Sequence, residues 1–226
     1  MKKIGDWWLP ESDVYFSKWV SGLKTDTTYG HKFQIEYIKK IIELSDNHGV
    51  IIDVGANVGM FSYAFSKKFK IVHAFEPVPI NFNCLQENLK TVSNVLIHTK
   101  ALGSEEGIVK MSGRLVNTGS FHIVPDDAFS NKRNYLDVVD IPLVTLDSFN
   151  FDNVDTIKID CEGFEFNVLT GAMDTLIKCK PLLAIEFTVV NKGGSIDTHN
   201  KVKNLLSSMG YKEIWQSADD AIYKII

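Results

Sequence analysis

Two apolar runs of the sequence each end in an acidic residue, and two glycines follow the first acid. Asp53 ends the first run, with Gly55 and Gly59 behind it, and Glu76 ends the second run. In a strand–helix–strand unit the ends of both parallel strands lie side by side. Glycines let a ligand approach the backbone, and a carboxylate accepts hydrogen bonds from ribose hydroxyls. The pattern predicts a nucleoside site, with Glu76 at the ribose and Asp53 at a cationic amino group or ordered water.

The glycine spacing narrows the choice of nucleoside cofactor. A dinucleotide fingerprint counted from Gly55 needs glycines where this chain has Asn57 and Met60. The phosphate-binding P-loop pattern does not occur in the sequence. A cofactor with ribose and adenine but no pyrophosphate therefore fits, and S-adenosylmethionine is such a cofactor. The alternative is a structural turn without a ligand, which the acids at both strand ends disfavour.

Two later apolar runs also end in acids, at Asp160 and Glu186, and Glu162 follows Asp160 closely. Ligands of an open α/β sheet bind at the carboxyl ends of its strands, so these acids are expected to join Asp53 and Glu76 at one edge. A helix cap is the alternative role for Asp160. Four acids on one edge favour a polar site over four caps.

Transfer of a methyl group from a sulfonium to a hydroxyl needs an aligned acceptor oxygen and a group that takes its proton. Asp160 or Glu162 could take that proton directly, or through a bound divalent cation, for which an oxygen-rich site favours Mg²⁺. Glu162 could instead only orient the turn or the acceptor. The polar loop 117–120 is either a plain turn or a contact to cofactor or acceptor. His122, just behind it, is a further candidate base.

Composition restricts the class of protein and its partners. The 226 residues carry a net charge of −4 without a basic run, so no nucleic-acid surface is expected. No apolar segment has the length of a membrane span, and the first residues do not resemble a signal peptide. The three cysteines, Cys84, Cys161 and Cys179, are widely spaced and form no C-x-x-C pair. We therefore expect buried thiols in a reducing, cytoplasmic compartment, not a disulfide framework or a zinc site.

The chain divides into an aromatic-rich extension over 1–30 and a single domain over 31–226. Aromatic residues of the extension are too many to stay exposed, so the extension is expected to pack on the domain or to line a pocket. An insertion at about 108–145 has alternating polar and apolar residues, which predicts antiparallel strands and a mobile loop near 125–134. The aromatic residues of the extension are Trp7, Trp8, Tyr15, Phe16, Trp19 and Tyr29.

Strand and helix patterns alternate through the rest of the domain. This alternation predicts an α/β fold with a doubly wound, mostly parallel sheet. A hairpin over 211–226 adds one antiparallel strand. The expected strands are 50–54, 71–75, 94–99, 156–160 and 182–186, and the expected helices are 33–44, 58–68, 79–89, 164–177 and 199–209.

Seven segments of the sequence, in order and spacing, resemble the FkbM family of S-adenosylmethionine-dependent methyltransferases. The resemblance covers roughly residues 45–190. Its combination of ID-x-GAN-x-G, then FEP, then KID-x-EG-x-E is far more specific than a lone glycine motif. The segments are IIDVGANVGMFS at 51–62, AFEPVPINFNCLQENL at 74–89, ALGSEEG at 101–107, NTGS at 117–120, PLVTLDSF at 142–149, KIDCEGFEFNVLTGA at 158–172 and PLLAIEF at 181–187.

This resemblance implies a class I methyltransferase fold, a Rossmann-like seven-stranded sheet with the last strand antiparallel and helices on both faces. It also implies positions around the cofactor. Asp53, Gly55, Asn57 and Gly59 would line its methionine end, Glu76 would bind the ribose, Asn81, Ala101 and Leu102 would lie near the adenine, and Asp160 and Glu162 would lie by the transferred methyl. Ala56, Phe61 and Pro77 complete the expected cofactor-binding set.

The resemblance further implies O-methylation of a hydroxyl on a sugar or on a glycosylated or other small-molecule acceptor. Methylation of another acceptor class, such as protein, lipid or nucleic acid, is the alternative enzyme hypothesis. A cofactor-binding module without catalysis is a third hypothesis, although such a module would be expected to lose strand-end acids or glycines that this chain has. The extension and residues 111–140 are expected to form the acceptor pocket. Cys161 departs from the family pattern, because an apolar residue is common there.

Overall fold

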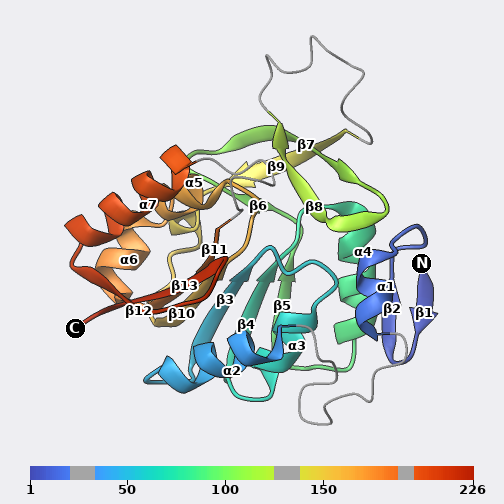
Figure 1. Cartoon of the computed structure of the whole chain (residues 1–226), viewed down its shortest axis with the longest axis horizontal. Helices are drawn as coiled ribbons and strands as arrows, with labels where there is room; N and C mark the ends of the chain where they lie inside the picture. Colours follow the sequence, from blue (N-terminus) through green and yellow to red (C-terminus); the bar gives the residue numbers. More distant parts are fainter. Residues whose placement is uncertain (21–33, 125–137, 188–195) are drawn as a thin grey trace.

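The computed structural model describes residues 1–20, 34–124, 138–187 and 196–226, and a seven-stranded sheet forms its centre (Figure 1). The strand order is β12-β13-β11-β10-β3-β4-β5. Neighbouring strands from β11 to β5 are parallel, and β13 is antiparallel to both β11 and β12. The predicted doubly wound sheet with one antiparallel strand is confirmed. The strands are β3 (Val50–Val54), β4 (Ile71–Phe75), β5 (Val95–His98), β10 (Val154–Ile159), β11 (Leu182–Glu186), β12 (Tyr211–Gln216) and β13 (Asp220–Ile225).

Helices cover both faces of this sheet, and apolar side chains fill both interfaces. Parallel strands covered on both faces read as continuous apolar runs, as these strands do. One face packs against α2 (Ile35–Leu44), α3 (Met60–Ser66) and α4 (Pro79–Leu89). The other face packs against α5 (Glu165–Thr170), α6 (Met173–Cys179) and α7 (Ile196–Ser208). No helix within the described ranges is long and apolar enough to cross a membrane.

The single helix expected over 164–177 is wrong, because the structure has α5 and α6 with a break between them. Gly171 lies at the break, where an added Cβ would lie 1.8 Å from the carbonyl oxygen of Gly103. Asp147, in the short helix η2 (Asp147–Phe149), accepts hydrogen bonds from the backbone N–H groups of Asp174 and Thr175 and from the Thr175 hydroxyl. This cap comes from a distant segment and starts α6 as a separate helix.

A second sheet lies across the carboxyl edge of the first, in the order β6-β9-β7-β8 (Figure 1). β7 is antiparallel to β8 and β9, so the antiparallel strands expected in the insertion are present. Apolar side chains of this sheet, among them Ala101, Phe121 and Leu143, pack in one cluster with Val78, which precedes α4. The loop expected near 125–134 lies outside the described residues. The strands are β6 (Ala101–Leu102), β7 (Gly107–Arg114), β8 (Asn117–Val124) and β9 (Val139–Val144).

The first twenty residues form a hairpin of β1 (Lys2–Ile4) and β2 (Trp7–Leu9), followed by α1 (Tyr15–Val20). Trp7 and Phe16 are buried against a small apolar cluster that includes Val58. Asn88 of α4 accepts the backbone N–H of Trp8 and donates to the carbonyl oxygens of Trp8 and Val58. These contacts hold the segment beside α4 (Figure 1).

Candidate active site

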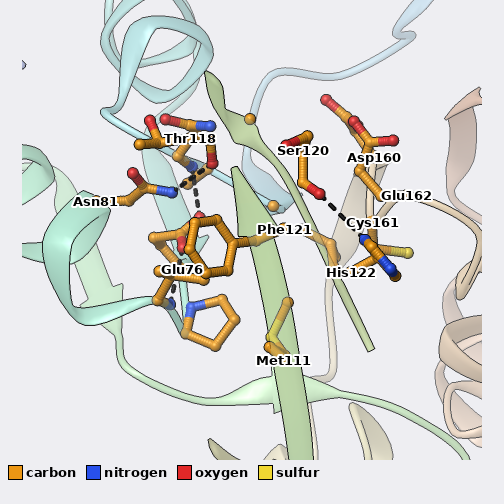
Figure 2. A pocket seen from close by; sticks show the side chains of 18 of the residues that line it. Glu76, Asn81, Met111, Thr118, Ser120, Phe121, His122, Asp160, Cys161 and Glu162 are labelled. Carbon is orange, nitrogen blue, oxygen red and sulfur yellow. Dashed lines mark hydrogen bonds between the residues drawn. The ribbon is translucent and has the colours of Figure 1, made fainter. Parts of the chain in front are cut away.

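A cavity of about 860 Å³ lies between the carboxyl edge of the main sheet and the second sheet. Figure 2 shows Glu76 and Asn81 on one side of the cavity and Asp160, Cys161 and Glu162 on the other. Most of the predicted site residues line it, although they come from distant parts of the chain. Those lining residues are Gly55, Ala56, Asn57, Phe61, Glu76, Pro77, Asn81, Ala101, Leu102, His122, Asp160 and Glu162.

The turn from β3 into α3 forms the floor of the cavity. Gly55 has a φ of +79°, and a Cβ added there would lie 1.8 Å from the carbonyl oxygen of Asp160. Only glycine fits this conformation and this close approach. The N–H groups of Gly55 and Ala56 both donate to the Phe75 carbonyl, at 3.0 and 2.9 Å. The turn is thereby held between β4 and β10.

Glu76 follows β4 and is 4 % exposed. Its Oε2 accepts the backbone N–H of Asn57 and its Oε1 that of Val78, each at 2.8 Å. Burial raises the pKa of Glu76 from 4.5 to about 7, although these hydrogen bonds and one from the Asn81 side chain oppose the rise. Each carboxylate oxygen can accept a second hydrogen bond. The group is therefore a suitable acceptor for a pair of ligand hydroxyls.

Two predicted cofactor ligands, Asp53 and Gly59, lie behind the cavity and are not among its lining residues. Asp53 is fully buried and accepts a hydrogen bond from the Ser62 hydroxyl at 2.6 Å. A Cβ added at Gly59 would lie 2.7 Å from a methyl group of Leu85 in α4. Both residues therefore lie behind the glycine turn. The cationic partner of Asp53 is a lysine of this chain.

That lysine is Lys158, near the carboxyl end of β10 and 1 % exposed. Its Nζ lies 3.3 Å from Asp53 Oδ1, 3.2 Å from Asp160 Oδ2 and 3.3 Å from the carbonyl oxygen of Gly55. Burial lowers the pKa of Lys158, but the charges of Asp160 and Asp53 outweigh burial and raise it overall, so the ammonium stays protonated. Sequence reasoning missed Lys158. The available signal was a lysine between two isoleucines in the second half of a central strand.

A carboxyl pair forms where β10 and β11 end. The parallel register pairs Ile159 with Ile185, so Asp160 and Glu186 follow side by side, and both line the cavity. The negative charge of Asp160, and then burial, raise the pKa of Glu186 to about 9 despite the opposing charge of Lys158. At neutral pH Glu186 therefore holds a proton beside Asp160.

The turn after Asp160 is backbone-strained. Glu162 has a φ of +52° and Gly163 one of +103°, and the left-handed region is uncommon for a non-glycine residue. The buried Glu165 accepts the Gly163 N–H at 2.9 Å, which holds the turn against α5. Burial raises the pKa of the neighbouring Cys161 thiol well above its ordinary value. Glu162 lines the cavity, whereas Cys161 is unsuited to act as a thiolate.

His122 of β8 is on the cavity wall beside the acidic turn (Figure 2). Its Nδ1 lies 3.1 Å from the Ser120 carbonyl oxygen, which can only accept. Nδ1 therefore carries the proton, and Nε2 of the neutral ring is an acceptor. The prediction of a loop over 117–120 is wrong, because these residues pair with β7 as the first part of β8. They also line the cavity, and the Thr118 carbonyl accepts a hydrogen bond from Asn81 Nδ2 at 3.0 Å.

The expected Mg²⁺ is not supported. Within the part of the chain that the structure describes, no group of three or more His, Cys, Asp or Glu side chains could hold a metal ion. The positive charge between Asp53 and Asp160 comes from the Lys158 ammonium.

The strand order, the single antiparallel strand and a cavity at the glycine turn define a class I methyltransferase fold. The family described as Methyltransferase FkbM domain matches residues 53–213, so the chain belongs to the FkbM methyltransferase family. S-adenosylmethionine is the methyl donor that this family membership implies.

Known proteins similar to this chain are also methyltransferases. Methyltransferase 1 of Beauveria bassiana is 26% identical over 230 residues, which cover 86% of this chain and 90% of that protein. Hexuronic acid methyltransferase AglP of Haloferax volcanii is 26% identical over 171 residues, covering 75% of this chain and 66% of that protein. The crystal structure of Methyltransferase FkbM from Methylobacillus flagellatus superimposes with a TM-score of 0.53 at 23% identity. The matched part covers 77% of this chain and 42% of that protein's chain.

Proposed function

We propose that this protein transfers the methyl group of S-adenosylmethionine to a hydroxyl of a sugar or glycosylated acceptor. The observation that carries the proposal is one cavity with Glu76 on one side and Asp160 on the other (Figure 2), where Glu186 follows the neighbouring strand beside Asp160. Glu76 suits the ribose of the donor, and the carboxyl pair suits the acceptor hydroxyl. The cavity volume of about 860 Å³ lies in the range of ligand pockets, on the order of 300–1,000 Å³.

Two buried amide oxygens support a bound nucleoside cofactor. Asn57 Oδ1 and Asn81 Oδ1 are buried, lack a hydrogen-bond partner among the described residues, and belong to side chains of the cavity wall. A buried polar atom without a partner costs free energy, about 1–3 kcal/mol. Amino groups of the donor would satisfy both oxygens. When bound, the donor supplies an electrophilic methyl group, and the residues of this chain orient the acceptor and take its proton.

Asp160 is our first candidate for the group that takes this proton. It lines the cavity, and its Oδ2 lies 3.2 Å from the Lys158 ammonium. As the acceptor oxygen bonds to the methyl carbon, its proton would pass to Asp160, next to the proton already held by Glu186. Glu162 and Nε2 of His122 remain the second and third candidates, because both line the same cavity.

The remaining walls suit a carbohydrate. Tyr15, Phe16 and Phe121 give the cavity aromatic surface, on which the apolar faces of sugar rings pack. Lys100 and Arg114 also line it and could pair with an acidic sugar, since Arg binds carboxylates with two parallel hydrogen bonds. A hexuronic acid is therefore a specific acceptor to test, and the name of the Haloferax volcanii relative supports it.

The test has two stages. Calorimetry with S-adenosylhomocysteine measures the donor site, and we expect a dissociation constant in the micromolar range. Methyl transfer is then assayed by mass spectrometry on a panel of neutral sugars, hexuronic acids and their glycosides, with a peptide and an RNA as alternative acceptors. Absence of binding would refute the donor assignment. Binding with transfer to the peptide or RNA alone would refute the sugar assignment, and binding without transfer to any acceptor would leave a cofactor-binding module.

A further inference from the structure

Asp13 is a fully buried carboxylate in the first segment of the chain, outside every motif discussed above. Its Oδ1 accepts the backbone N–H of Phe16 at 2.8 Å, at the start of α1. Its Oδ2 accepts both the backbone N–H of Thr118, at 2.9 Å, and the Thr118 hydroxyl, at 3.1 Å. One carboxylate thus joins α1 to β8, across 105 residues of sequence.

Thr118 continues this connection to the cofactor side of the cavity. Its carbonyl oxygen accepts a hydrogen bond from Asn81 Nδ2 at 3.0 Å (Figure 2). The Asn81 side chain also lies near enough to Glu76 to oppose the rise in the pKa of that carboxyl. All four side chains are at least 96% buried, with exposures of 0% for Asp13, 1% for Thr118, 1% for Asn81 and 4% for Glu76.

The segment at the other end of this network forms part of the cavity wall. Tyr15 and Phe16 of α1 line the cavity. The Val14 N–H also donates to the Val116 carbonyl at 3.0 Å, which holds α1 against the tip of the β7–β8 hairpin. Asp13 therefore sits where the aromatic wall, the hairpin and the cofactor side meet.

We propose that Asp13 is a positioning residue that couples cofactor binding to the placement of residues 1–20 on the cavity. A ligand that hydrogen-bonds Glu76 and Asn81 fixes Asn81, then Thr118, and through Asp13 the start of α1. Coupling between two sites is reciprocal, so the docked segment also favours the bound cofactor. The donor would then bind first and complete the wall against which the acceptor packs. The inference rests on the proposed function only in naming the two ligands.

Asp13 could instead be a structural cap without influence on binding. The chain offers a matched control in Asp147, whose carboxylate also caps a helix and accepts the backbone N–H and hydroxyl of a threonine, Thr175. Asp147 is not among the residues that line the cavity, and its carboxylate accepts hydrogen bonds from Asp174 and Thr175 at the start of α6. Asp13→Asn and Asp147→Asn therefore each replace a carboxylate that caps a helix and binds a threonine, the first beside the cavity wall and the second away from it.

Tryptophan fluorescence can follow the segment directly. Three of the 4 tryptophans, Trp7, Trp8 and Trp19, lie in residues 1–20, and the fourth is Trp215. In a Trp215→Phe background, quenching by acrylamide reports how well the segment is shielded. We expect S-adenosylhomocysteine to reduce quenching in this parent and in Asp147→Asn, but not in Asp13→Asn. We also expect Asp13→Asn to weaken S-adenosylhomocysteine binding by about tenfold, within the usual range of coupling between sites.

The outcomes separate the coupling from the proposed function. Asp13→Asn and Asp147→Asn could show the same ligand-dependent shielding and the same affinity for S-adenosylhomocysteine. In that case Asp13 is only a cap, and the inference is overturned. If Asp13→Asn does not fold, Thr118→Val decides, because it removes only the hydroxyl bond and should lose part of the shielding; a parent-like Thr118→Val overturns the inference. Intact coupling without sugar methylation would overturn the acceptor assignment alone.

Discussion

Three acidic residues line the cavity in different electrostatic environments, namely Glu76, Asp160 and Glu186. Glu76 is buried and hydrogen-bonded by two backbone donors. Asp160 is partly exposed and paired with the Lys158 ammonium. Glu186 holds a proton because Asp160 lies beside it. Environments that push the pKa values of acids apart are common at functional sites. We therefore propose that Glu76 binds the donor and that the Asp160–Glu186 pair contacts the acceptor.

Replacing Glu76 with alanine should weaken S-adenosylhomocysteine binding by about 1–3 kcal/mol, because the ribose hydroxyls would lose a charged acceptor. Calorimetry measures the change. Glu87→Ala is the control, since Glu87 lies on the nearby helix α4, is partly exposed and pairs with Lys90. Equal dissociation constants for both variants would remove Glu76 from the ribose site.

The affinity for S-adenosylhomocysteine should also depend on pH through Glu76. Its pKa in the cofactor-free protein is raised from 4.5 to about 7. The protonated form has lost acceptor capacity, so affinity should fall as the pH falls through about 7. The stability of the cofactor-free protein depends on pH in the opposite direction. The contribution of Glu76 to the free energy of unfolding is complete below about pH 4.5 and is lost as the pH rises through about 7. Calorimetry between about pH 5.5 and 8.5 tests this, and a flat profile in that range contradicts the assignment.

Asp160→Asn should reduce turnover far more than it reduces donor affinity, since an amide cannot take the acceptor proton. We expect kcat to fall by about 10²–10⁴-fold, the usual range for general base catalysis. Steady-state kinetics and calorimetry on the same preparation provide the comparison. Glu162→Gln and His122→Gln are parallel variants, and full activity of Asp160→Asn would transfer the role to one of them.

At the scale of elements, the site depends on how closely the β3–α3 turn approaches β10. Gly55 permits this approach by its left-handed backbone and its missing Cβ. The second sheet closes the cavity from above with β8, and the hydrogen bond between Asn81 and Thr118 joins α4 to β8. In our proposal the elements of the parallel sheet form the donor side, and β8 with α1 forms the acceptor side.

Gly55→Ala tests this close approach. Its methyl group would lie 1.8 Å from the Asp160 carbonyl oxygen, and the φ of +79° is unfavourable for alanine. The turn must move, which should lower stability by about 1–3 kcal/mol and abolish detectable S-adenosylhomocysteine binding. Thermal melts with and without ligand measure both effects. Gly107→Ala serves as control, because a Cβ there meets nothing within 4 Å. Ligand-dependent stabilisation that survives in Gly55→Ala would contradict the assigned role.

At the scale of the whole molecule, one buried ion pair links the centre of the sheet to the site. Lys158 and Asp53 are register partners on β10 and β3, and both face the side covered by α2 and α3. The Lys158 ammonium also lies 4.7 Å from the centre of the Phe61 ring in α3. Stability of the fold and geometry of the cavity floor thus share the same contacts.

Lys158→Met should destabilise the protein by about 3–5 kcal/mol, because Asp53 would stay buried without its countercharge. Chemical denaturation measures the free energy of unfolding. Adding Asp53→Asn to Lys158→Met should recover part of the loss, since it removes the uncompensated charge. Lys90→Met, at an exposed ion pair, is the control and should be nearly neutral. A loss as small as that of the control would show that the buried pair contributes little.

The sequence by itself determined the features that depend on local pattern. Strand–helix alternation predicted the doubly wound sheet, and the strands expected over 50–54, 71–75 and 182–186 have those bounds in the structure. The acids Glu76 and Asp160 could be assigned to one edge because parallel strands end at the same edge. Side-chain type and position along a strand suffice for such inferences.

Only the tertiary structure decided which distant groups meet. The register of β3 and β10 placed Asp53 opposite Lys158, which separates it from the residues that line the cavity. The cap from Asp147 divided one expected helix into α5 and α6. The contact between Asp13 and Thr118 also joins segments more than a hundred residues apart. Sequence periodicity reports which face of an element is buried, but it contains no information on which side chain of another element will lie opposite.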